Sequence, residues 1–154
     1  MMIERKLEND LADVFKNMPE LSDTQIICSR EIAQVGKTKV EDDTKTTIVA
    51  VACGFRQNDA FSLSPINISV SVTIMTRAEL DSTSEKHDTV VEAIADRISY
   101  FHKFGLVMSQ LFTNEKFYAG ELRMDGGTPR TYDSNTCTWS DTINFSIRGS
   151  EKFQ

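Results

Sequence analysis

The chain has 154 residues, of which 40% are hydrophobic and 26% charged, and its formal net charge is −6. This length and mixture predict one globular domain, residues 1–154, and argue against disorder of the whole chain. An acidic chain without clusters of Lys and Arg is not expected to hold nucleic acid by neutralising phosphates, although an acidic wall that DNA slides past remains compatible. The sequence contains no apolar leader-like segment and no run of 18 apolar residues, so we expect neither standard secretion nor a membrane span.

An amphipathic helix is predicted over roughly residues 3–18, because apolar side chains recur there at spacings of three and four residues. They are Ile3, Leu7, Leu11, Val14, Phe15 and Met18. The charged side chains between them are expected to face solvent: Glu4, Lys6, Glu8, Asp10 and Asp13. Pro19 lies just past the predicted end of this helix.

Short strands are predicted around residues 24–29 and 31–36. The next segment, 37–45, is highly charged and is predicted to be a loop or hairpin tip. Its charged residues include Lys39, Glu41, Asp42 and Asp43. Residues 46–55 then form a nearly continuous apolar run, which predicts a central strand that is buried on both faces.

Residues 66–75 alternate between two kinds of side chain. One set is apolar: Ile66, Ile68, Val70, Val72 and Ile74. The other set is short, polar and uncharged: Asn67, Ser69, Ser71 and Thr73. The alternation predicts a long strand with one face in the core. Because the polar face lacks the Lys and Glu that usually keep a strand soluble, we expect another surface to cover it.

A second amphipathic helix is predicted from an N-cap at Ser84 to about Phe104, with Gly105 in the C-cap position. Its apolar face is formed by Val90, Val91, Ile94, Ala95, Ile98 and Phe101. Glu85 and Asp88 lie in its first turn, where the helix dipole favours acidic side chains.

The last third is predicted to contain strands over 117–124 and 135–148, joined by a loop over 125–130 whose Asp-Gly-Gly element is a hairpin-turn signal. Apolar residues of the final strand share one parity, and Asp141 interrupts them. We favour a bulge near 140–142 over an Asp141 that lies beyond the core. The order of elements predicts an α+β fold, with one mainly antiparallel sheet and two amphipathic helices packed on it.

The search for chemistry predicts no catalytic, cofactor-binding or metal site. His87 and His102 are separated by about 20 Å of helical rise, too far to share a metal within one helix. His87 beside Asp88 is interpreted as part of a solvated first turn rather than as a general base. The glycines of segment 125–130 are too weak a signal for a nucleotide site.

Two further groups of residues are interpreted as packing residues. Unpaired cysteines are usually buried, so the three cysteines are expected to be buried apolar residues in a reducing compartment: Cys28, Cys53 and Cys137. Four aromatic residues are expected in the core rather than in a platform that stacks bases or sugars: Phe117, Tyr118, Tyr132 and Trp139.

The order of the predicted elements resembles a known family. The elements are an N-terminal amphipathic helix, a charged hairpin, a long alternating strand that leads into a second helix, and final strands that carry Trp139 and Ile-Asn-Phe-Ser-Ile at 143–147. In this order the chain resembles the tail-terminator, or tail-completion, proteins that join head and tail in long-tailed bacteriophages. The resemblance covers most of the chain and is one of pattern.

The resemblance implies a structural protein of the virion, made in the host cytoplasm, that forms a hexameric ring. The ring would cap the tail tube, contact its protein and the head-side connector protein, and let DNA pass through its lumen without specific binding. It implies no enzyme activity, cofactor, metal or membrane contact. The interface residues predicted on this basis are Asn67, Ser69, Ser71, Thr73, Lys39, Glu41, Asp42, Asp43 and Arg77.

Other classes of protein remain open. The chain also fits another phage neck or minor tail protein. A cytoplasmic protein-binding adaptor would be a compact monomer with a single apolar groove. A small enzyme would need a deep pocket assembled from scattered residues such as His87, Asp88, Asp125 and Tyr132.

Overall fold

The computed structural model describes residues 2–29, 46–59 and 65–152. Its helical elements are α1 (Ile3–Lys16), η1 (Pro19–Leu21), η2 (Ala78–Leu80), α3 (Glu85–Lys103) and α4 (Gly105–Phe112). Its strands are β1 (Thr24–Cys28), β2 (Thr47–Cys53), β3 (Gln57–Asn58), β4 (Ile66–Arg77), β5 (Phe117–Asp133) and β6 (Thr138–Glu151). The strand predicted at 31–36 and the charged segment 37–45 both lie outside the described residues.

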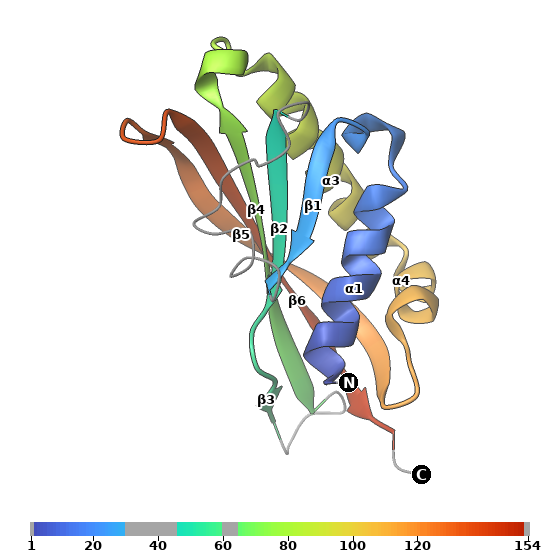
Figure 1. The fold of residues 1–154 in the computed structure, drawn as a ribbon. Coiled ribbons are helices and arrows are strands. Elements are labelled where there is room, and N and C mark those ends of the chain that lie inside the picture. Colours follow the sequence, from blue (N-terminus) through green and yellow to red (C-terminus); the bar gives the residue numbers. More distant parts are fainter. Residues whose placement is uncertain (1, 30–45, 60–64, 153–154) are drawn as a thin grey trace.

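The strands form one sheet in the order β1-β2-β4-β6-β5, and β3 pairs with the start of β4. β1 and β2 are parallel, and every other pair is antiparallel. The three described α-helices pack on one side of this sheet (Figure 1). This arrangement confirms the predicted α+β fold with a mainly antiparallel sheet.

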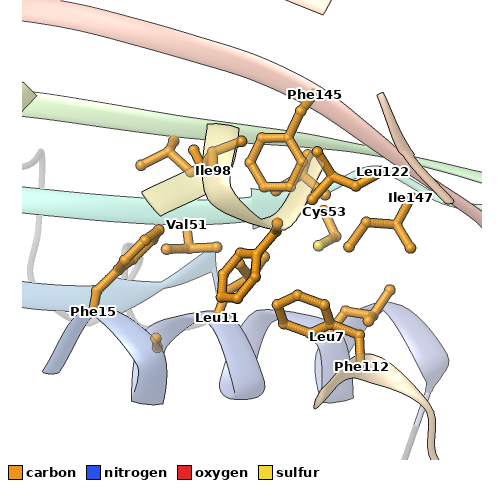
Figure 2. Packing of buried hydrophobic residues seen from close by; sticks show 14 of the residues in the cluster. Leu7, Leu11, Phe15, Val51, Cys53, Ile98, Phe112, Leu122, Phe145 and Ile147 are labelled. Carbon is orange, nitrogen blue, oxygen red and sulfur yellow. The ribbon is translucent and has the colours of Figure 1, made fainter. Parts of the chain in front are cut away.

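The alternation of β4 works as predicted. Its five apolar side chains, from Ile66 to Ile74, are buried in the main core, and the polar side chains between them point to the opposite face. Leu7, Leu11 and Phe15 of α1 contact this core together with residues from α3, α4 and the sheet (Figure 2). Each such side chain contributes roughly 1.5–3 kcal/mol relative to an exposed one. β2 is buried on both faces, as its apolar run predicted.

The helix layer differs from the prediction in one element. The long second helix ends at Lys103, and a further helix, α4, begins at Gly105. Gly105, predicted as a C-cap, therefore starts the next helix. The run that follows it is apolar on almost every side, so it lacks the periodicity that marks an amphipathic helix.

The hairpin of β5 and β6 is longer than predicted. Residues 125–130 are not a loop but part of β5, and the turn lies at 134–137. Gly126 has φ of +83° at a register shift, so the glycine signal marks a bulge within the strand. A Cβ on Gly127 would lie 2.1 Å from the carbonyl oxygen of Thr142, so only glycine fits there. We call residues 123–143, which include this exposed part of β5, the arm; it projects at the upper left of Figure 1.

Two carboxylates of α1 that were predicted on the solvent side are buried. Glu4 forms an ion pair with Arg56, with Nε–Oε1 and Nη2–Oε2 distances of 2.7 and 3.0 Å. Glu8 accepts hydrogen bonds from the backbone N–H of Cys53 at 2.8 Å and of Ser29 at 3.2 Å. The prediction was wrong because these partners lie far away in the sequence. Both carboxylates fasten α1 to the sheet.

Candidate interaction surfaces

The predicted polar residues of β4 lie together on the side of the sheet opposite the described helices. They are Asn67, Ser69, Ser71 and Thr73, and all are half-buried or exposed. We define the open face as the outward side chains of β4, β6 and β5 on this side. The β1–β2 part of the same side differs, because Ile27, Ile48 and Ala50 form a small buried apolar cluster there.

The open face is polar and almost uncharged at its centre. β6 places Thr142, Asn144 and Ser146 directly opposite residues of β4. The hydroxyl of Ser71 donates to Oδ1 of Asn144 at 2.9 Å, and the Thr73 and Thr142 hydroxyls are 3.4 Å apart. Short side chains that bond to one another give a flat surface with little entropy to lose on contact.

Three arginines border the open face, and they differ in their partners. Arg77, a predicted interface residue, pairs with Glu79 at 2.7 Å, and Arg123 lies 3.7 Å from Glu121. Arg148 forms no ion pair with any described residue, although it is in register with Glu121. Its buried Nε and the buried Oδ1 of the cross-strand neighbour Asn67 have no hydrogen-bond partner in the described part of the chain.

The other four predicted interface residues cannot be placed on this surface. Lys39, Glu41, Asp42 and Asp43 lie outside the described residues. Their predicted role therefore stays a prediction.

A buried polar chain crosses the helix side of the sheet at the start of α3. The Thr47 and Thr76 hydroxyls are 2.9 Å apart, Thr76 Oγ1 is 2.6 Å from His87 Nδ1, and His87 Nε2 is 2.7 Å from Asp141 Oδ2. Asp141 also accepts from Arg130 Nε at 2.7 Å. When His87 donates from Nε2 and accepts at Nδ1, every hydrogen bond in this series has one donor and one acceptor.

This series of hydrogen bonds corrects two predictions. His87 is fully buried rather than solvated, because the carboxylate of Asp81 accepts hydrogen bonds from the N–H groups of Lys86 and His87 and caps α3 in place of Ser84. Asp141 does not mark a bulge in β6. The β4–β6 register continues without a shift, and the bulge opposite Asp141 lies in β5, where Thr128 pairs with Thr142 and Thr131 pairs with Ser140. Asp141 stays on the core side because His87 is its partner there.

A hydroxyl, an imidazole and a carboxylate in a row are also the parts of an activated nucleophile. Here the hydroxyl belongs to Thr76, which is fully buried and also bonded to Thr47. Neither of two shallow surface depressions in the described structure is lined by Thr76, His87 or Asp141. In this conformation the arrangement connects β2, β4 and β6 to α3 and does not present a reactive group to solvent.

The residues suggested for an enzyme do not converge on a pocket. Asp88 pairs with Arg130 of the arm, and Tyr132 stacks on Trp139 with ring centroids 4.9 Å apart. Neither depression is lined by these residues or by Asp125. Among the described residues, no group of three or more His, Cys, Asp and Glu side chains has an arrangement that could hold a metal ion.

The aromatic and cysteine predictions are only partly correct. Phe117 is buried in the core, but Tyr118 and Tyr132 are about half exposed. Cys28 and Cys53 are buried, whereas Cys137 is exposed in the turn of the arm, where its φ is +51°. Burial, and then the nearby Glu8 carboxylate, raise the pKa of the Cys53 thiol.

The helix side carries an acidic groove between η1 and α3, with a volume of about 440 Å³. Glu20, Glu92 and Asp96 line it and are exposed, and none forms an ion pair with a described residue. Arg97, the cation of this groove, lies over the Tyr100 ring at 5.9 Å.

An apolar patch lies next to this groove. We call it the α4 patch; it consists of Tyr100, Phe104, Leu106, Val107 and Leu111. Leu106 is 74% exposed and Phe104 is 52% exposed. A cluster of large apolar side chains at such exposure is typical of a surface that contacts another molecule. The sequence interpretation missed this surface because it missed α4.

Comparison with known proteins adds no family assignment. No protein-family model matches the sequence, and no curated protein matches it. None of the described helices is long and apolar enough to span a membrane.

Proposed function

We propose that this protein is a structural virion subunit that forms a ring, as tail-terminator or tail-completion proteins of long-tailed bacteriophages do. In this role it caps the tail tube and joins it to the head-side connector, and DNA passes through the ring without specific binding. The observation that carries the proposal is the open face, a long sheet surface of short uncharged polar side chains.

The geometry supports a ring because each copy presents unlike surfaces. The open face and the α4 patch belong to opposite layers of the molecule, and they differ in chemistry. A contact between unlike patches is heterologous, and it closes into a ring when the rotation between copies is suitable. The arm extends the open face beyond the core, where it can contact a neighbouring copy (Figure 1).

The proposal is tested by the mass of the purified protein, measured by light scattering over a range of concentrations, alone and with the candidate tail-tube protein. We expect a species of ring size in at least one condition. Ser71→Glu places a charge in the centre of the open face and should abolish that species. Ser82→Glu, in an exposed turn, is the matched control. A protein that stays monomeric and ignores the tube protein at every concentration would refute the proposal.

A protein-binding adaptor is the second candidate function, and the α4 patch favours it. An adaptor needs one apolar surface for its partner and no assembly of its own. Two variants distinguish the two functions. Leu106→Glu should remove partner binding if the protein is an adaptor, whereas sensitivity of self-assembly to Ser71→Glu is expected only for the ring subunit.

A further inference from the structure

Two groups of charged residues without an ion pair to a described residue lie on opposite layers of the protein. On the open face, Arg148 has no ion pair with a described residue, and nearby Arg123 makes only a long contact of 3.7 Å to Glu121. On the helix side, Glu20, Glu92 and Asp96 are exposed in the groove and are likewise without an ion pair to a described residue. Stronger carboxylate–arginine contacts of the described residues, such as that of Glu4 with Arg56, are made within one copy.

From this complementarity we infer that the open face of one copy docks on the acidic groove of a second copy, with Arg148 facing Glu92 and Asp96. The inference rests on the proposed function and identifies the contact between neighbouring ring subunits. The occupant is a second copy of this chain, because its own groove supplies the unpaired carboxylates that the open face lacks.

The local charges decide the direction of docking. Near Arg148 the open face carries two arginines and one glutamate, Arg123, Arg148 and Glu121, in a protein of net charge −6. The groove carries three carboxylates, and its single arginine is held over Tyr100. Two open faces would bring arginines together, and two grooves would bring carboxylates together. Only the contact between unlike surfaces pairs opposite charges, and such a contact is heterologous.

The contact also gives the guanidinium of Arg148 a carboxylate partner. The guanidinium of Arg148 presents a planar fork that can bind a carboxylate with two hydrogen bonds. The hydroxyls of Ser69 and Ser71 lie on the same side of β4, where they can accept or donate to polar groups at the edge of α3. Tyr100 and Ala93 in the groove provide the apolar part of the contact.

The test exchanges charges between the two surfaces. Variant A carries Arg148→Glu, and variant B carries Glu92→Lys with Asp96→Lys. Each variant alone opposes like charges at every contact, so its self-association should weaken at least about tenfold relative to the wild type. A mixture of A and B restores opposite charges at every contact of an alternating ring, and it should assemble again. Lys103→Glu, an exposed charge reversal outside both surfaces, is the control.

Sedimentation velocity, alone and with the tail-tube protein, measures assembly, and thermal melting checks that each variant is folded. Recovery in the mixture, while the folded single variants fail, supports the contact. If variants A and B assemble as well as the wild type, the proposed contact is overturned but the ring function is not. The same holds if a folded mixture of A and B does not assemble. A wild type that never assembles overturns the ring function itself.

Discussion

Replacing Asp141 with alanine tests whether the buried polar chain holds the fold together. The carboxylate accepts from His87 Nε2 and Arg130 Nε, both at 2.7 Å. His87 is fully buried in the wild type, whereas the side chain of Arg130 is 34% exposed and can be hydrated after the substitution. The loss in free energy of unfolding therefore arises mainly at His87.

A buried donor that loses its partner costs about 1–3 kcal/mol, and hydrogen bonds to charged groups contribute roughly 1.5–3 kcal/mol. These two figures describe overlapping effects, so we expect the free energy of unfolding to fall by about 2–4 kcal/mol. For a chain of about this length, 1 kcal/mol lowers the melting temperature by roughly 2–4 °C, so Tm should fall by about 4–16 °C.

Urea denaturation followed by circular dichroism measures this change, with Thr142→Ala as the matched control. Thr142 is the next residue in β6, but it points to the open face and its hydroxyl lies 3.4 Å from that of Thr73. We expect the control to stay within about 0.5 kcal/mol of the wild type. Thr76→Val with Asp141→Ala should cost less than the sum of the single changes, because both act through His87. An Asp141→Ala protein as stable as the control would refute the reasoning.

Three other predictions concern the remaining buried and exposed groups. Glu8→Ala leaves the N–H of Cys53 without its acceptor and should lower the free energy of unfolding in urea by about 1–3 kcal/mol. Burial raises the pKa of Glu4, but hydrogen bonds involving Arg56 outweigh it and hold that pKa below 4.5. The stabilisation is therefore complete above the unfolded pKa and lost as the pH falls through the folded pKa, so acid melting curves should show a smaller loss of stability for Glu4→Gln than for the wild type. With a maleimide at neutral pH, exposed Cys137 should react first, since Cys53 is buried and its pKa is raised.

Each of these predictions has its own control. Asp13→Ala removes an exposed carboxylate of α1 and should leave urea stability within about 0.5 kcal/mol of the wild type. Glu20 is exposed and has no ion pair with a described residue, so Glu20→Gln should keep the acid sensitivity of the wild type. Cys137→Ser should abolish the fast thiol reaction. Equal effects of Glu8→Ala and Asp13→Ala, or a fast reaction that survives Cys137→Ser, would contradict the structure.

The strand of residues 66–77 could be predicted from sequence because its two faces differ from Ile66 to Ile74, and a slip of one residue would move all of its apolar side chains out of the core. The buried carboxylates were harder to predict, since Arg56 is 52 residues from Glu4 and Cys53 is 45 residues from Glu8. A local signal was nevertheless present. Glu4 and Glu8 continue the stripe of Leu11 and Phe15 at spacings of four, three and four residues, so they belong to a buried face of the helix.

Asp141 carried a similar signal, which the sequence interpretation assigned to the wrong cause. A carboxylate with core parity either indicates a shift in register or has a buried partner. The partner, His87, lies 54 residues earlier in the sequence, so no local pattern indicates the second explanation. The α4 patch gave no periodic signal at all, because a short helix that is apolar on both its buried and exposed sides looks like an undirected apolar run.

The distribution of charge explains why the open face can serve assembly without weakening the subunit. The carboxylates of Glu4, Glu8 and Asp141 all bind their partners on the helix side or within the core. They stabilise the fold, so a contact on the other side of the sheet does not need to disturb them. The centre of the open face holds neutral side chains, whose desolvation costs less than that of charges. A variant such as Ser71→Glu should therefore change assembly while leaving the stability of the single subunit nearly unchanged, which separates the two roles experimentally.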